Sequence, residues 1–295
     1  MLGSLFAISS AFFWALAVIL FKKSGDVFSP LSLNIYKSCV ALILILGTML
    51  VLKIPFFPAA PLKDWLLLSL SGILGITLAD IFFFMALNKL GASLVAIVEC
   101  LYLPSVLFFS YILLGEKLGL GGIMGSILVL SAILVGSMKK KQMADRNKGS
   151  ESDLGGIVSG ILSMIFVAFG IVMIKEVLEQ SNVFWATLVR VTAGCISLLV
   201  ILVCHPNRRH YFNELKFSRA WLTAFPASVC GNYIALLCWV AGMKYTSASQ
   251  AAILNQMSTI FIFILAAIFL KEKITVNKAF AIVLALAGAC LTIFT

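Results

Sequence analysis

Charged residues are scarce in this chain. Only 12% of its 295 residues are charged, whereas 62% are hydrophobic. An ordinary soluble domain is about a quarter charged, so the composition excludes a water-soluble globular enzyme. A helix that crosses a bilayer needs about 20 apolar residues, and ten such helices would occupy most of the chain. The composition therefore predicts an all-α integral membrane protein with several spans and no sizeable soluble domain.

Several sequence motifs are also missing. The seven cysteines show no Cys-x-x-Cys spacing, and the two histidines, His205 and His210, have no cluster of acids or cysteines around them. We therefore expect no metal site and read the cysteines as small packing residues. No Gly-x-x-x-x-Gly-Lys-Ser/Thr segment is present, which excludes ATP hydrolysis by that route. We expect no cofactor and no enzymatic activity.

The net charge of +10 does not point to nucleic acid. A nucleic-acid footprint is a basic face on a polar domain, but nearly every Lys and Arg of this chain lies between apolar runs. There are ten such runs: Met1–Phe21, Leu31–Leu52, Trp65–Leu87, Ala92–Gly115, Leu118–Met138, Leu154–Ile174, Asn182–Cys204, Ala220–Met243, Tyr245–Leu270 and Ala279–Thr295. Because backbone groups in lipid must be satisfied within their own segment, each run is predicted to be one helix. The first run is read as a retained helix because no basic residue precedes it.

The loop charges predict an orientation. The odd-numbered loops between these runs hold 15 Lys and Arg residues, and the even-numbered loops hold five. Cytoplasmic loops carry the excess of basic residues. We therefore expect both termini on the non-cytoplasmic side of the inner (cytoplasmic) membrane. Residues 139–153, which open on three lysines, contain the segment Gly-Ser-Glu-Ser and have low hydrophobicity, are predicted to be a flexible cytoplasmic linker.

An internal duplication is the most specific pattern in the sequence. Residues 92–118 match residues 248–274 without a gap, with eight identities that include Glu-Lys at positions 116–117 and 272–273. At a slightly different offset, Lys37 matches Arg190. The pattern predicts two five-helix repeats, 1–138 and 154–295, on either side of the linker. An odd number of helices inverts the second repeat in the membrane, and such repeats place a substrate site near the bilayer midplane.

The repeated segments resemble a known family. Met-Ala-Leu-Asn-Lys-Leu-Gly-Ala-Ser from Met85, Leu-Leu-Gly-Glu-Lys-Leu from Leu113 and Phe-Leu-Lys-Glu-Lys-Ile from Phe269 are similar to the EamA family of the drug/metabolite transporter (DMT) superfamily. The resemblance implies a secondary transporter for small metabolites, often amino acids, whose fifth and tenth helices are peripheral. Lys37 departs from the family pattern, because an arginine is common there; Arg190 retains it in the second repeat.

Four charged residues lie inside the predicted spans: Lys37, Asp80, Glu99 and Arg190. A charge at the centre of a span costs about 2.5–3.5 kcal/mol, so each is a functional hypothesis. In the functional reading, Asp80 or Glu99 carries a proton or binds an amino group, and Lys37 or Arg190 holds a carboxylate or phosphate. Alternatively, Lys37 pairs with one of the acids, and Arg190 bonds carbonyls at a helix end. Glu99 is preferred over Asp80 because Tyr102 follows one turn later.

Uncharged residues complete the candidate site. Those expected at the substrate or coupling site are Tyr102, Asn255, Gln256, Trp14 and Asn232. Tyr36 and Trp239 are further aromatic candidates for the pathway, although interface anchoring or packing is the more common role of such residues in membrane helices. The Glu-Lys pairs at the helix exits either pair locally, cap a neighbouring helix or form a gating salt bridge.

The sequence favours a secondary active transporter that moves a small polar metabolite, such as an amino acid or related compound, by alternating access. Its expected partners are that metabolite, a proton or counter-substrate, and membrane lipid. Two alternatives remain: a lipid or polyprenol flippase and a membrane-embedded lipid-modifying enzyme. Gly-x-x-x-Gly pairs at 121/125 and 156/160 allow close helix packing, expected within one chain of a monomer rather than between two chains.

Overall fold

The computed structural model describes residues 2–115, 120–137, 150–272 and 275–291, and every regular element in these residues is a helix. Within the described residues, eight helical segments are long and apolar enough to cross a membrane. They are Leu2–Ser24, Pro30–Val51, Leu62–Leu90, Ala92–Leu114, Leu154–Val172, Val183–Cys204, Trp221–Tyr245 and Ala248–Phe269. These segments match eight of the ten predicted spans, and the prediction of an all-α, multi-pass membrane protein is confirmed.

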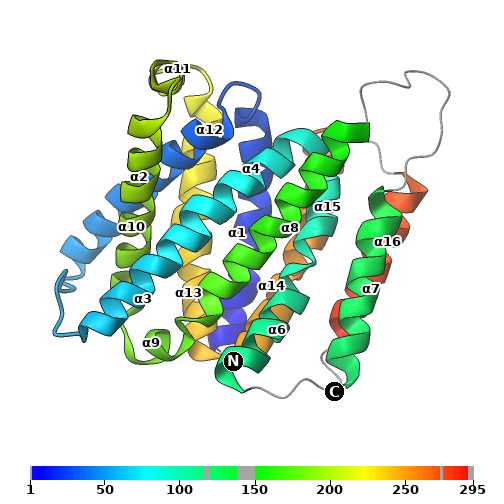
Figure 1. Ribbon diagram of the computed structural model, residues 1–295, viewed down its shortest axis with the longest axis horizontal. Coiled ribbons are helices and arrows are strands. Elements are labelled where there is room, and N and C mark those ends of the chain that lie inside the picture. Colours follow the sequence, from blue (N-terminus) through cyan, green and yellow to red (C-terminus); the bar gives the residue numbers. More distant parts are fainter. Residues whose placement is uncertain (1, 116–119, 138–149, 273–274, 292–295) are drawn as a thin grey trace.

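Two shorter apolar helices lie where the fifth and tenth spans are predicted. Helices α7 (Leu120–Ser137) and α16 (Val276–Leu291) pack mainly against each other and stand at one edge of the bundle (Figure 1). Their contacts with the other spans run through α5 (Ala92–Glu99) and α6 (Tyr102–Leu114). This peripheral place is the one that the family resemblance implies. Helix α1 (Leu2–Ser24) begins and α16 ends at the same end of the bundle (Figure 1).

Two spans contain a π-helical segment. The third span consists of α3 (Leu62–Gly72), η1 (Ile73–Leu78) and α4 (Ala79–Leu90), in which η1 is π-helical. The eighth span repeats this pattern with α12 (Trp221–Ser228), η2 (Val229–Ala235) and α13 (Leu236–Tyr245). Both π segments begin at positions that the duplication makes equivalent. Such segments widen a helix and are frequent at functional sites.

Two further spans are broken near their middle. The fourth span changes from α5 to α6 at Cys100 and Leu101. The ninth changes from α14 (Ala248–Asn255) to α15 (Met257–Phe269) at Gln256. Each of these four runs is one span, as predicted, but its helix changes inside the span: through a π-helical segment in the third and eighth runs, and through a short turn in the fourth and ninth. Backbone groups freed inside a membrane protein are tolerated where protein or a cavity surrounds them.

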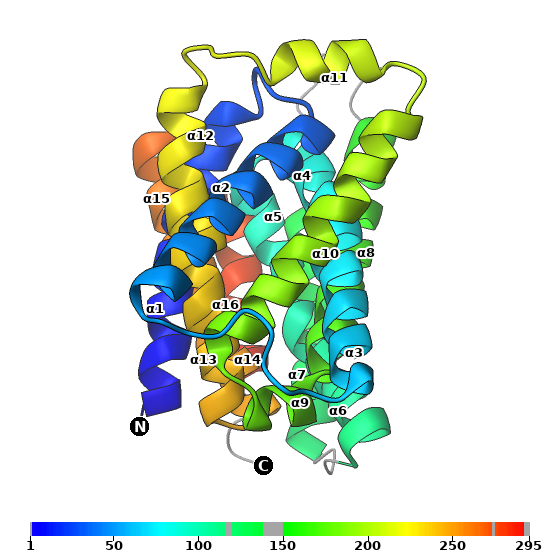
Figure 2. The ribbon, with the colours of Figure 1, turned by 90° about the vertical axis from the view of Figure 1, so that its left-hand side faces the viewer.

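The second, sixth and seventh spans are continuous helices, α2 (Pro30–Val51), α8 (Ser150–Val172) and α10 (Val183–Cys204). Because α8 begins at Ser150, the last four residues of the predicted linker are helical; residues 139–149 lie outside the described part of the chain. Two short loop helices follow α8 and α10: α9 (Lys175–Gln180) and α11 (Arg208–Glu214). Helix α11 lies across one end of the bundle (Figure 2).

Close packing joins α8 to the first repeat. A Cβ at Gly160 would lie 2.7 Å from Val98 Cγ1, and one at Gly156 would lie 2.8 Å from Leu90 Cδ2. Both distances are shorter than real carbon contacts, so only glycine lets the helices approach this far. This Gly-x-x-x-Gly pair packs within the chain, as expected.

A carboxylate from the second repeat caps a helix of the first. Glu272 accepts hydrogen bonds from the N–H groups of Ala92 (2.8 Å) and Ser93 (3.1 Å) at the start of α5. The first N–H groups of a helix have no partner inside it, and a carboxylate there also meets the positive end of the helix dipole. The capping alternative is thus confirmed for Glu272; the pair at 116–117 and Lys273 lie outside the described residues.

Candidate functional site

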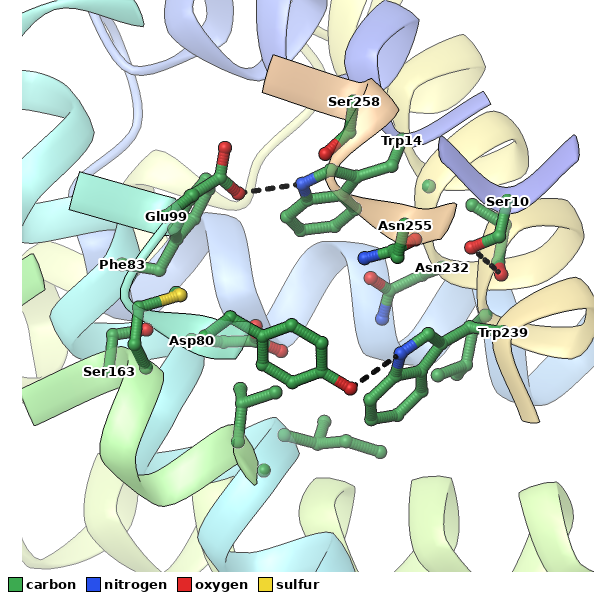
Figure 3. A pocket seen from close by; sticks show the side chains of 18 of the residues that line it. Ser10, Trp14, Asp80, Phe83, Glu99, Ser163, Asn232, Trp239, Asn255 and Ser258 are labelled. Carbon is green, nitrogen blue, oxygen red and sulfur yellow. Dashed lines mark hydrogen bonds between the residues drawn. The ribbon is translucent and has the colours of Figure 1, made fainter. Parts of the chain in front are cut away.

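A cavity of about 120 Å³ lies between the two repeats. A bound water needs roughly 10–15 Å³ of such space, so the cavity is large enough for several waters or one small metabolite. Figure 3 shows the side chains that point into it. The lining residues are Ser10, Trp14, Gly75, Ile76, Asp80, Phe83, Glu99, Tyr102, Ser163, Met164, Val167, Arg190, Gly231, Asn232, Ala235, Leu236, Trp239, Asn255, Gln256 and Ser258.

The lining of the cavity is itself duplicated. Equivalent positions of the two repeats lie 153 residues apart in the first span of each repeat and 156 apart in the third and fourth. Eight pairs of such positions line the cavity: Ser10 and Ser163, Trp14 and Val167, Gly75 and Gly231, Ile76 and Asn232, Asp80 and Leu236, Phe83 and Trp239, Glu99 and Asn255, Tyr102 and Ser258. Both repeats therefore present the same positions to one central space. The chemistry differs between them, because the acids come from the first repeat and the amides from the second.

Glu99 is the last residue of α5, at the helix break. Its Oε1 accepts a hydrogen bond from Trp14 Nε1 at 2.8 Å (Figure 3), while its buried Oε2 has no partner. The aromatic partner of Glu99 is thus Trp14 on α1, whereas the sequence argument gave this place to Tyr102. Tyr102 accepts instead from Trp239 Nε1 at 3.1 Å.

Arg190 lies at the side of the cavity that α10 forms. Its guanidinium carbon is 5.2 Å from the centre of the Trp239 ring, and the side chain is 2% exposed. The Nε and Nη1 atoms are buried without a hydrogen-bond partner. The guanidinium of Arg190 therefore contacts the face of the Trp239 ring, which attracts cations, in place of the expected helix-end carbonyls. Its Nε and Nη1 atoms remain free to donate hydrogen bonds.

Lys37 does not line the cavity. Its side chain is buried behind the cavity wall, where Nζ lies 2.6 Å from Asp80 Oδ2 and donates to Asn232 Oδ1 at 2.9 Å. The alternative in which Lys37 pairs with an acid is the one found, and the acid is Asp80. The pair neutralises one charge of each sign and ties α2 to the π segment of the second repeat through Asn232.

Unpartnered polar atoms gather around the cavity. Buried polar groups are almost always hydrogen-bonded, yet four lining residues have buried side-chain atoms without a partner. These are Glu99, Ser163, Arg190 and Asn255. A ligand or water inside the cavity would satisfy these atoms.

Most of the polar lining was expected from the sequence. Of the nine residues expected at the substrate or coupling site, all but Lys37 line the cavity. Ser10, Ser163, Ser258 and Phe83 line the cavity without having been expected there. For Tyr36 the packing alternative is the one found, because its ring lies between Phe28 and Trp221. Ser10 and Ser163 are equivalent positions of the duplication, which could have revealed them.

Comparisons with known proteins agree with this architecture. A solved structure titled "Crystal structure of protein" superposes with a TM-score of 0.72 over 98% of this chain and 95% of its own, at 16% sequence identity. This likeness shows the fold. No curated protein matches the chain. The profile of the EamA-like transporter family matches residues 1–138 and 154–294, one match for each repeat. The chain therefore belongs to the EamA-like transporter family.

Proposed function

We propose that the protein is a secondary active transporter that moves a small polar metabolite, such as an amino acid or related compound, across the cytoplasmic membrane by alternating access. Proton coupling or exchange drives the movement. The observation that carries the proposal is the central cavity, which both repeats line and which collects buried polar atoms without partners. A lateral groove, as a lipid flippase would need, is less well supported because the lining comes from spans of both repeats.

The charges of the cavity favour a zwitterion. Lys37 and Asp80 neutralise each other, which leaves a carboxylate at Glu99 and a guanidinium at Arg190 with unused hydrogen-bonding atoms. Glu99 can accept from an ammonium group, and Arg190 can donate to a carboxylate. Asn255 and Ser163, which also line the cavity, offer uncharged hydrogen-bonding atoms.

The same carboxylate is our candidate for proton coupling. In the absence of substrate, a proton on Glu99 would remove an uncompensated charge from the cavity, which lowers the desolvation cost. An ammonium group and a proton would then compete for one carboxylate, and this competition couples their movements.

Uptake into proteoliposomes tests the proposal. We expect a panel of radiolabelled L-amino acids to include at least one that accumulates in vesicles with the wild-type protein. Hydrogen bonds to charged groups are worth about 1.5–3 kcal/mol, so Glu99→Gln and Arg190→Gln should each lower its uptake roughly tenfold to a hundredfold. Glu176→Gln, at an exposed position of α9, is the matched control and should transport normally. Normal proton-coupled uptake by Glu99→Gln would refute the assignment of the proton carrier to Glu99.

A further inference from the structure

The break in the fourth span leaves one main-chain carbonyl without its usual donor. In a continuous helix the oxygen of Cys100 would accept from the N–H of residue 104. Residue 104 is proline, which has no N–H to donate. The main-chain bonds that cross the break run from Cys100 to Ile97, from Leu101 to Val98 and from Ser105 to Leu101. None of these three reaches the oxygen of Cys100.

A side chain of the second repeat supplies the missing donor. Gln256 Nε2 donates to the oxygen of Cys100 at 3.1 Å, and Gln256 is 5% exposed. Positions 100 and 256 are equivalent in the duplication. Where the first repeat has Pro104, the second has Ile260, which keeps its N–H. Only the first repeat therefore needs a donor from outside, and the partner repeat provides it.

We propose that Gln256 is a positioning residue: it holds the break between α5 and α6 and thereby keeps the Glu99 carboxyl directed into the cavity. Glu99 immediately precedes Cys100, so the direction of its side chain depends on the backbone of the break. Gln256 thus acts through Glu99 rather than on the substrate. The hydrogen bond from Gln256 is independent of the proposed function, but its importance for transport rests on the proposed role of Glu99.

A second feature ties the same two breaks together. Thr259 Oγ1 lies 3.4 Å from Cys100 Sγ and donates to the oxygen of Ala96 at 3.4 Å. The start of α15 therefore contacts α5 over one turn on the Glu99 side of the break. If the hydrogen bond from Gln256 were lost, Thr259 would still hold α15 against α5, but the carbonyl oxygen of Cys100 would have no donor.

A second-site variant makes the inference testable. Gln256→Ala should lower the thermal midpoint in detergent by roughly 2–4 °C and shift the infrared carboxyl band that disappears in Glu99→Gln. Pro104→Ala restores an N–H at the right place, so the double variant Pro104→Ala/Gln256→Ala should recover both the midpoint and the band. Pro104→Ala alone should change little, because a carbonyl oxygen accepts two hydrogen bonds.

The control is Pro226→Ala in the Gln256→Ala background, since Pro226 lies inside α12 and offers Cys100 no donor. The inference is overturned if Pro226→Ala rescues as well as Pro104→Ala, if Gln256→Ala changes neither readout, or if it lowers the midpoint while the Glu99 band stays unchanged. Neither readout needs a substrate. A wild-type protein that transports no amino acid would contradict the proposed function and leave this test intact.

Discussion

At the scale of single residues, the intramembrane charges are accommodated in two different ways. Lys37 and Asp80 form a buried pair that Asn232 completes. Glu99 and Arg190 instead face the cavity with atoms that no protein group satisfies. A buried pair is costly to break, whereas an unsatisfied charge beside a cavity is available to a ligand. This difference separates structural charges from those that we propose to bind substrate.

Removal of one member of the pair should destabilise the protein more than removal of both. Lys37→Met leaves Asp80 without its cation, and loss of one partner of a buried pair typically costs roughly 3–5 kcal/mol. The double variant Lys37→Met/Asp80→Leu removes both charges and places at position 80 the residue that the second repeat has at Leu236. We expect its thermal midpoint in detergent to lie above that of Lys37→Met. A thermal midpoint of the double variant below that of Lys37→Met would contradict the idea that Asp80 is destabilising once its cation is lost.

The charged residues that the sequence singled out share one property: each is expensive to place in a membrane. Glu99, Asp80 and Arg190 are conspicuous because charges are rare in apolar helices. Ser163 and Phe83 are inexpensive there and leave no such signal. Whether Lys37 forms an ion pair or binds a ligand depends on the geometry of its side chain. Neither composition nor residue spacing reveals that geometry.

At the scale of elements, one glycine lets two spans touch. A Cβ at Gly72 would lie 2.1 Å from the main-chain oxygen of Arg190, in α10. Backbone cannot move aside as a flexible side chain can, so Gly72→Ala should strongly reduce the yield of monodisperse protein. At Gly47 in α2, a Cβ would meet no atom within 4 Å, and alanine favours a helix by about 1 kcal/mol. Size-exclusion profiles and thermal midpoints should show the first variant impaired and Gly47→Ala unimpaired.

A contact between the repeats at the end of the bundle should depend on pH. Glu214 Oε2 accepts from the N–H (3.0 Å) and hydroxyl (2.6 Å) of Ser29, at the start of α2. Burial raises the pKa of Glu214, but hydrogen bonds from Ser29 and Ser32 and the neighbouring His210 outweigh it, so the pKa lies below the usual 4.5. A lowered pKa means that the stabilisation is present above the usual value and is lost as the pH falls through the lowered one.

Hydrogen exchange measures this dependence. The first turn of α2 should exchange faster as the pH drops below about 4.5 once the intrinsic pH dependence of exchange is subtracted. Glu214→Gln should exchange fast at every pH. The same acid-induced increase in this variant would assign the effect to another group.

The helices were predictable from the sequence, but their interruptions were not. Long apolar runs specify a span, because lipid forces each run to satisfy its own backbone. The π segment from Ile73 and the break after Glu99 carry no such signature, since they depend on partners in other spans such as Gln256. Pro104 and Pro226 were the local hints, because a proline inside a span removes a helical hydrogen bond.

At the scale of the whole molecule, the orientation remains a prediction. A phosphatase that folds only outside the cytoplasm should be active when fused after Thr295, and green fluorescent protein fused there by the same secretory route should be dark. Fusions after Arg146, in the predicted cytoplasmic linker, should give the reverse pattern. A fluorescent fusion and an inactive phosphatase fusion at Thr295 would contradict the predicted orientation. They would show that the C-terminus lies in the cytoplasm and that the basic loops lie outside.

The contact between positions 100 and 256 has a geometric consequence. Two equivalent residues of an inverted repeat can touch only where the two-fold axis that relates the repeats passes close by. In the alternating-access cycle that we propose, the two repeats exchange conformations, so each residue moves to the place that the axis assigns to its equivalent, and residues next to the axis move little. Glu99 and Asn255, beside it, should therefore stay at nearly constant depth, while the contacts of Glu214 with Ser29 and of Glu272 with Ala92 break at one face. The breaks in the fourth and ninth spans would then stay nearly fixed during transport, and the two ends of the bundle would move most.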